Sequence, residues 1–220
     1  KNRDAAVLLP DYAVRLSILD FDSFPRDPKE QQTLVKFRLK KSVPFDIEAA
    51  VVGYIPQPAD GKKTEVISAV APLEILARYE APFRAAGLTP GFLTASSLSF
   101  LHLLDGPGLT VTARLSGRFL TVLVTSGSNL KLVRCLETQP DLSGLAADLY
   151  PTFVFIEDQL GRKADRLLLC GFGSKVEEAT RRFEAELAIP VQAFESPFGT
   201  PGEYNAGLLG YLAQLEGAAV

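Results

Sequence analysis

The chain has 220 residues, of which 47% are hydrophobic and 22% are charged, so it can bury a substantial core and is neither disordered nor a fibrous repeat. Its net charge of −3 and isoelectric point near 5.3 argue against non-specific nucleic-acid binding. No apolar run approaches the roughly 20 residues that cross a bilayer, and Pro10 and Asp11 come too early for a signal peptide, which predicts a cytoplasmic protein.

Residues that commonly form metal and catalytic sites are scarce. Cys135 and Cys170 both lie in apolar segments typical of buried strands, and His102 is the only histidine. We therefore expect neither a disulfide framework nor a zinc site. Walker A and GxSxG motifs are missing, and adjacent carboxylates on helices point apart, so no catalytic residues are predicted. Because methionine is absent even at the first position, we expect an amino-terminal segment to be missing from this sequence; the alternative is that modified residues are missing from it.

The amino-terminal part alternates short apolar runs with amphipathic segments. In chain order it predicts strands at 5–9 and 14–21, a helix that begins at Pro28 and ends before Pro44, strands at 49–55 and 64–70, a helix from Pro72 to Gly87, a strand at 91–94 and a helix from Ser96. The turn signal at Pro10 suggests that the first two strands pair, and the polar segment 56–63 predicts a hairpin. Residues 105–108 (DGPG) are the predicted boundary between two lobes.

The residues after this boundary follow a more regular pattern. They predict strands at 109–115, 119–125 and 130–137, a helix at 142–160, a strand at 166–170, a helix that begins at Ser174, a strand at 191–194 and a closing helix. Glu177 lies three residues after Ser174, which predicts a capping box. The order βββαβαβα, a meander continued by right-handed crossovers, is typical of one half of an α/β protein with an actin-like (RNase H-type) fold and mixed sheets.

One glycine-containing turn is a candidate ligand site. Ligands of open α/β sheets gather where a strand leads into a helix, because helix N–H groups can hold anions and glycine lets a ligand approach the backbone. The candidate nucleotide-binding residues are Gly171, Phe172, Gly173 and Ser174. A turn of this composition can also serve packing alone, and that alternative stays open.

A second candidate site combines positive charge with apolar surface at the end of the first predicted helix. The candidate partner-binding residues are Lys36, Arg38, Lys40, Lys41, Pro44 and Phe45. Such a cluster suits an acidic protein or acidic lipid headgroups. The alternative is an ordinary solvated helix face.

Taken in order, several segments resemble the PilM family of type IV pilus assembly proteins and the GspL cytoplasmic domains of type II secretion systems. These segments are residues 9–11 (LPD), 41–46 (KSVPFD), 71–74 (APLE) through 85–90 (AAGLTP), 166–174 (RLLLCGFGS) and 205–210 (NAGLLG). The resemblance covers nearly the whole sequence and lies in the succession of segments rather than in one motif.

The resemblance implies a two-lobed actin-like fold. Residues 1–105 would be the remainder of the first lobe, with an insertion subdomain at about 20–70 and the amino-terminal part missing, and residues 109–220 would be the second lobe. The resemblance also implies a bacterial cytoplasmic scaffold, peripheral to the inner membrane through its partners. It would dock the cytoplasmic tail of a PilN-like membrane protein, alongside other pilus or secretion platform proteins.

The resemblance further places an Asp-x-Gly phosphate loop in the first hairpin of the second lobe, where its carboxylate would approach Mg²⁺. Residues 113–118 (ARLSGR) have no acidic residue there, so we expect a scaffold that is not an enzyme and has no metal site. This scaffold should bind a basic or amphipathic tail near residues 30–60. The alternative is a nucleotide-binding actin-like ATPase or phosphotransferase with ATP and Mg²⁺ as cofactors. A third hypothesis is an unrelated α/β interaction domain.

Overall fold

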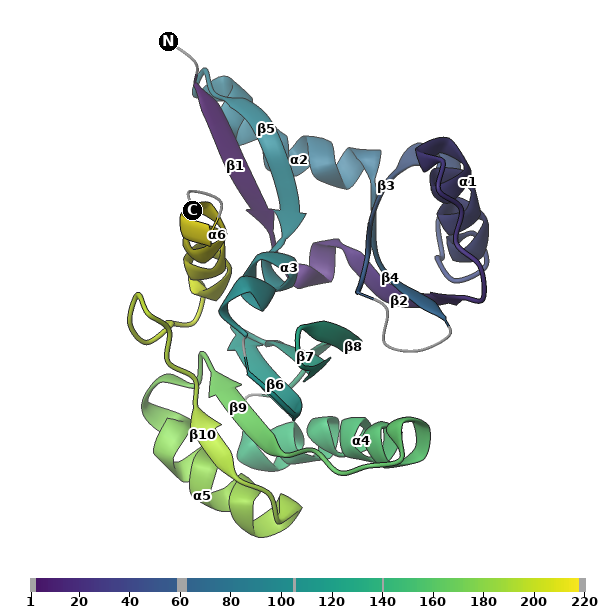
Figure 1. The fold of residues 1–220 in the computed structure, drawn as a ribbon. Helices are drawn as coiled ribbons and strands as arrows, with labels where there is room; N and C mark the ends of the chain where they lie inside the picture. Colours follow the sequence, from purple (N-terminus) through teal and green to yellow (C-terminus); the bar gives the residue numbers. More distant parts are fainter. Residues whose placement is uncertain (1–2, 59–62, 105, 140, 218–220) are drawn as a thin grey trace. The chain divides into compact units, whose positions relative to one another are not determined.

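The computed structural model describes residues 3–58, 63–104, 106–139 and 141–217 (Figure 1). The chain forms two compact units, Lys1–Ser96 and Ser97–Val220. This division precedes residues 105–108, which the sequence suggested as the boundary and of which Asp105 lies outside the described residues. Among the described residues, no helix is both long enough and apolar enough to span a bilayer.

The first unit contains a two-stranded parallel sheet. In this sheet β1 (Asp4–Leu9) pairs with β5 (Thr89–Ala95), and α2 (Leu73–Ala85) contacts both strands. The predicted pairing of the first two strands is wrong, because β2 (Arg15–Phe21) pairs with β4 (Thr64–Pro72) instead. Between β1 and β2 the chain forms the 3-10 helix η1 (Asp11–Ala13). A local turn signal cannot distinguish a hairpin from a chain that leaves one sheet for another.

The same unit contains a three-stranded antiparallel sheet in the order β2-β4-β3, where β3 is Ala50–Pro56. The predicted hairpin is confirmed, since β3 and β4 pair with Ile55 opposite Ile67, although residues 59–62 of its turn lie outside the described residues. The helix α1 (Pro28–Leu39) covers one face of this sheet (Figure 1), and the 3-10 helix η2 (Ile47–Ala49) precedes β3. The buried core between α1 and the sheet includes Phe21, Val35, Leu39, Ile47, Val52, Val66 and Val70.

Local chemistry explains where α1 begins. The Asp27 carboxylate accepts hydrogen bonds from the backbone N–H groups of Lys29 (3.1 Å) and Glu30 (3.0 Å), and proline occupies the first helical position. The helix is also tied to the edge strand, because the Gln32 side chain donates to the carbonyl oxygen of Val52 at 3.1 Å.

The second unit contains a five-stranded mixed sheet in the order β10-β9-β6-β7-β8. The strands are β6 (Leu109–Ser116), β7 (Phe119–Ser126), β8 (Asn129–Glu137), β9 (Arg166–Cys170) and β10 (Val191–Ala193). The first three form the predicted antiparallel meander, and β9 and β10 add to it in parallel. The predicted order βββαβαβα is confirmed.

Helices cover both faces of this sheet. Figure 1 shows α4 (Leu142–Leu160) and α5 (Val176–Leu187) on one face, where alternate residues of β6 such as Val111 and Ala113 join their core. Further helices are α3 (Ser96–Phe100), η3 (Leu101–Leu103) and α6 (Ala206–Gly217), and α6 packs on η3. Because both faces are covered, β6 is buried almost throughout.

The predicted capping box at the start of α5 is wrong. Residues Gly173–Lys175 form a 3-10 helix, η4, and α5 begins at Val176 without a side-chain cap. The Lys175 N–H donates to the carbonyl oxygen of Phe172 at 3.1 Å, which closes a tighter turn than the capping box requires.

One glycine sets how closely α6 approaches α3. A Cβ atom built on Gly210 would lie 2.2 Å from the carbonyl oxygen of Ser99 and 2.7 Å from the Cα of Phe100. Both atoms belong to the backbone, so a side-chain rotation cannot relieve the clash.

We therefore expect Gly210→Ala to reduce the free energy of unfolding by about 1–3 kcal/mol, because α6 must move away from α3. Denaturant unfolding followed by circular dichroism measures this loss. The matched control is Gly217→Ala in the same helix, whose added Cβ would meet nothing within 4 Å. Equal stability of the two variants would show that the approach of α6 to α3 is not tight.

Candidate functional site

The predicted glycine turn lies at the carboxyl end of β9, and packing explains its first two residues. Gly171 has φ +79°, and a Cβ there would lie 2.2 Å from the carbonyl oxygen of Leu115 on β6. Phe172 is only 5% exposed, and its ring packs edge-on against Phe183 with centroids 6.3 Å apart. Gly171 and Phe172 therefore hold the turn against the sheet rather than face a ligand.

The other two residues of the turn face solvent. Gly173 and Ser174 are exposed, and a Cβ on Gly173 would meet nothing within 4 Å. Of the four predicted nucleotide-binding residues, Gly173 and Ser174 are the two that are exposed.

A carboxylate meets the neighbouring β6–β7 hairpin, although no acidic residue is near it in the sequence. The backbone N–H of Gly117 donates to Oε1 of Glu203 at 2.9 Å, across 86 residues of chain. The Tyr204 hydroxyl also hydrogen bonds with Glu203, which raises the pKa of this tyrosine above its ordinary value. The sequence reasoning missed Glu203, because nothing local to residue 203 points to a hairpin so far along the chain.

Buried groups beside this hairpin offer no nucleophile. Burial raises the pKa of the Cys170 thiol to about 12, an effect that the positive charge of Arg114 offsets only in part, so the thiol stays protonated at neutral pH. Arg114 is 6% exposed, and its guanidinium lies 5.4 Å from the centre of the Phe100 ring. Among the described residues, neither cysteine is in a disulfide, and no group of three potential ligand side chains is placed to hold a metal ion.

Two members of the predicted basic cluster make contacts within the first unit. Lys36 reaches Glu48 at 3.7 Å, whereas Arg38 donates to the carbonyl oxygen of Asp20 at 3.1 Å and stacks over the Phe21 ring. These two side chains therefore serve the fold of the first unit. The exposed basic residues that remain are Lys40 and Lys41, just past the end of α1.

The two apolar members of the cluster also differ. Phe45 is half-buried and packs against the core under α1, while Pro44 is exposed. The Phe37 side chain on α1 is 66% exposed, and so it adds apolar surface that the sequence reasoning did not single out.

A further apolar surface lies on β3, at the edge of the three-stranded sheet. Val51 and Ile55 are 47% and 55% exposed on the face opposite α1. The Gln57 N–H, just past β3, donates to the Glu65 carbonyl oxygen, which sets the alternation of hydrogen bonds along the strand. The backbone N–H and C=O groups of odd-numbered β3 residues therefore face β4, and those of even-numbered residues face the open edge. Gln32 covers one of them, the carbonyl oxygen of Val52.

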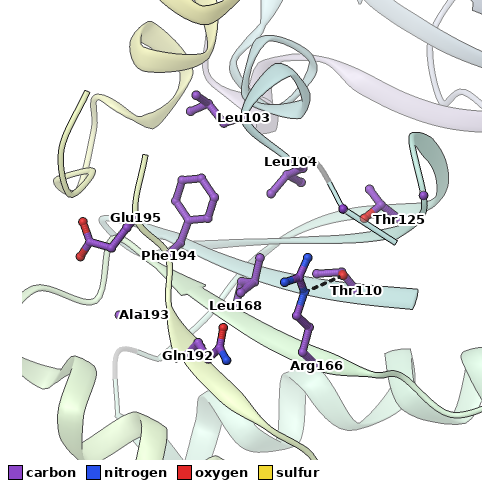
Figure 2. Close-up of a pocket in the computed structure, with 12 residues that line it drawn as sticks. Leu103, Leu104, Thr110, Thr125, Arg166, Leu168, Gln192, Ala193, Phe194 and Glu195 are labelled. Carbon is purple, nitrogen blue, oxygen red and sulfur yellow. Dashed lines mark hydrogen bonds between the residues drawn. The ribbon is translucent and has the colours of Figure 1, made fainter. Parts of the chain in front are cut away.

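The second unit also contains a pocket of about 290 Å³ that the sequence did not predict. Figure 2 shows the Arg166 guanidinium reaching into it and donating from Nε to Oγ1 of Thr110 at 3.0 Å. Leu168 and Phe194 supply apolar lining. Thr110 and Arg166 lie at the amino ends of β6 and β9, whereas Ala193 lies at the carboxyl end of β10, so the lining is not confined to the carboxyl ends where ligands of α/β sheets bind.

These two units define the class of the protein, which is an α/β chain with the actin-like fold. No protein-family model and no curated protein matches the sequence. Among solved structures, the chain is similar to one described as the PilM-PilN type IV pilus biogenesis complex, with a TM-score of 0.80, 18% identity, and coverage of 96% of this chain and 79% of that chain. The predicted resemblance to PilM is confirmed at the level of the fold.

Two further solved structures agree with this fold. One is the cytoplasmic domain of EpsL, an inner-membrane component of the type II secretion system of Vibrio cholerae, with a TM-score of 0.51, 13% identity, and coverage of 98% of this chain and 74% of that one. The other is a Bacteroides thetaiotaomicron protein with an actin-like ATPase fold and unknown function, with a TM-score of 0.57, 14% identity, and coverage of 94% and 73%.

Substitutions separate packing from ligand binding in the glycine turn. We expect Gly171→Ala to reduce the free energy of unfolding by about 1–3 kcal/mol through overpacking against Leu115, in addition to about 1 kcal/mol for its left-handed backbone. Gly173 has φ +54° but open space around it, so Gly173→Ala should lose only the roughly 1 kcal/mol that comes from the left-handed backbone. Urea unfolding of both variants tests this order, and an equal loss would contradict it.

Proposed function

We propose that this protein is an actin-like scaffold in the inner-membrane assembly platform of a type IV pilus or type II secretion system. In this proposal it works in the cytoplasm, catalyses no reaction, and docks the cytoplasmic tail of a PilN-type membrane protein. The observation that carries the proposal is the similarity over 96% of the chain to the PilM-PilN complex. The similarity to the EpsL cytoplasmic domain supports the secretion-system alternative.

The open edge of β3 is the surface that best suits an extended tail. A peptide strand could pair with the outward-facing backbone groups of β3, and its side chains would then lie beside Val51 and Ile55. Backbone pairing gives affinity in this mode, and the exposed apolar side chains give selectivity. To hydrogen-bond with the Val52 carbonyl oxygen, the peptide would have to displace the Gln32 side chain.

The charges near this edge favour an amphipathic tail with acidic residues over a basic one. The ion pair between Lys36 and Glu48 links the end of α1 to the segment that precedes β3. Lys40 and Lys41 follow in the chain and are exposed, so they can meet acidic side chains of the tail. Such exposed charges speed and orient association more than they add affinity.

We expect Ile55→Asp to weaken binding of a synthetic PilN-type tail peptide at least tenfold, because a charge on β3 would have to be desolvated when the peptide pairs. Fluorescence anisotropy of the labelled peptide with wild-type and variant protein measures the change in Kd.

The matched control is Leu215→Asp, in which an apolar side chain of similar exposure, 49%, changes on α6 of the second unit. Neutralisation of Lys40 and Lys41 by glutamine should weaken binding less and make it less sensitive to salt, with Lys29→Gln at the start of α1 as its control. An intact protein that binds no tail peptide would falsify the docking role.

One observation favours the second candidate function, a nucleotide-binding actin-like protein. Gly173 and Ser174 are exposed at the carboxyl end of β9, which is the end of a parallel strand where nucleotides bind in α/β sheets. Among the described residues, no group of three His, Cys, Asp or Glu side chains is placed to hold a metal ion at this turn.

Under the scaffold proposal, calorimetric titration of Mg-ATP into the wild-type protein should give no binding at millimolar ATP. Binding that Gly173→Asp abolishes would favour the nucleotide-binding candidate instead, because the new carboxylate would repel phosphate. The control is Gly161→Asp, at a left-handed glycine (φ +64°) with open space around it at the end of α4.

A further inference from the structure

Two turns of the second unit lie side by side at the carboxyl ends of its parallel strands, and we call this place the carboxyl edge of the sheet. The strands β6 and β9 are parallel neighbours, with Arg114 opposite Cys170, so their carboxyl ends are side by side. The Gly117–Arg118 turn follows β6, and the turn at Gly171 follows β9. This edge is where exposed backbone N–H groups would meet a ligand anion.

The segment before α6 lies against Gly117 and Gly171. Its Glu203 carboxylate accepts the Gly117 N–H at 2.9 Å. A Cβ on Gly117 would lie 3.4 Å from Oη of Tyr204, and one on Gly171 would lie 3.7 Å from the Cα of Glu203. Residues 203 and 204 therefore lie against the hairpin, and the backbone of Glu203 lies against the glycine turn.

The position of Glu203 is supported by its own loop. The Gly202 N–H donates to Oδ1 of Asn205 at 2.7 Å, and the Asn205 carbonyl oxygen accepts the Leu209 N–H at 3.0 Å within the first turn of α6. Glu203 is thus held at the hairpin by a loop anchored to the start of α6.

We propose that Glu203 is an internal anion that occupies the Gly117 N–H and keeps phosphate-bearing ligands away from this edge of the sheet. One N–H cannot donate at full strength to two acceptors, and a phosphate there would lie close to the Glu203 carboxylate and be repelled by it. Because Glu203 is exposed, competition between the two anions is direct. This inference deepens the proposed scaffold function, on which it rests, by giving a physical reason for weak nucleotide binding.

The test compares wild type, Glu203→Gln and Glu195→Gln by calorimetric titration with inorganic pyrophosphate and with Mg-ATP. Glu195→Gln is the matched control, because that carboxylate belongs to the same connecting segment but accepts from Thr200 (2.7 and 2.9 Å) rather than from the hairpin. We expect Glu203→Gln to bind pyrophosphate at least tenfold more tightly than wild type, and Glu195→Gln to match wild type. Equal affinity in all three proteins, or no binding to any at millimolar concentration, overturns the inference.

Weaker binding by Glu203→Gln would also overturn it, because the carboxylate would then support the ligand, as a ligand of Mg²⁺ does. Comparison of pyrophosphate with Mg-ATP detects this case, since pyrophosphate is added without metal. Hydrogen exchange at the Gly117 amide gives a second readout, and Glu203→Ala should accelerate it at least tenfold.

Tail-peptide binding to the same proteins separates this inference from the proposed function. Glu203→Gln lies in the second unit and should leave docking on β3 unchanged. If the tail binds while pyrophosphate affinity does not respond to Glu203, the inference fails alone. If no protein binds the tail but Glu203→Gln gains pyrophosphate affinity, the proposed function fails alone.

Discussion

The second unit depends on the parallel pairing of β6 with β9. This pairing joins the local β6-β7-β8 meander to the βα repeats that follow it, with Thr112 opposite Leu168 in the register. The contact is so close at its carboxyl end that the Leu115 carbonyl leaves no room for a Cβ on Gly171. The same closeness brings the Gly117 hairpin, the glycine turn and Glu203 to one edge. The candidate ligand edge is therefore a consequence of how the core strands pair.

Sequence patterns predicted the strands of this unit well, because the residues that mark each strand and its turns are adjacent in the sequence. The strand β9 has the bounds that its apolar run suggested, and the meander strands differ from their predicted bounds by at most one residue. Short turns with glycine at positive φ, such as Gly117 and Gly127, end these strands, and their signal is contained in two to four residues. Where the partner is distant in sequence, as for β1 and β5, the local pattern predicted the strands but not their pairing.

The candidate sites show the same division. Residue type correctly marked the turn at Gly171 as unusual, but only the structure separates Gly171, which packs on Leu115, from Gly173, which has open space. In the basic cluster, charge alone could not reveal that Arg38 stacks on Phe21 or that Lys36 is paired with Glu48. The predicted docking region, residues 30–60, contains β3, but the sequence did not show that β3 is an edge strand, because that depends on the order of strands in the folded sheet.

The hairpin at Gly117 shows that the absence of an acidic residue from a segment does not exclude a carboxylate beside it in the folded chain. The sequence lacks an acidic residue in this hairpin, yet the structure places the Glu203 carboxylate there. A carboxylate that holds a metal ion favours phosphate binding. A carboxylate that accepts a turn N–H disfavours it, because it occupies the hydrogen-bond donor and repels the phosphate charge. The chemistry at this edge therefore follows from which atom the carboxylate faces, and here that atom is a backbone N–H. The proposed tail docking on β3 and the proposed anion exclusion by Glu203 rest on residues of different units, so neither proposal is evidence for the other.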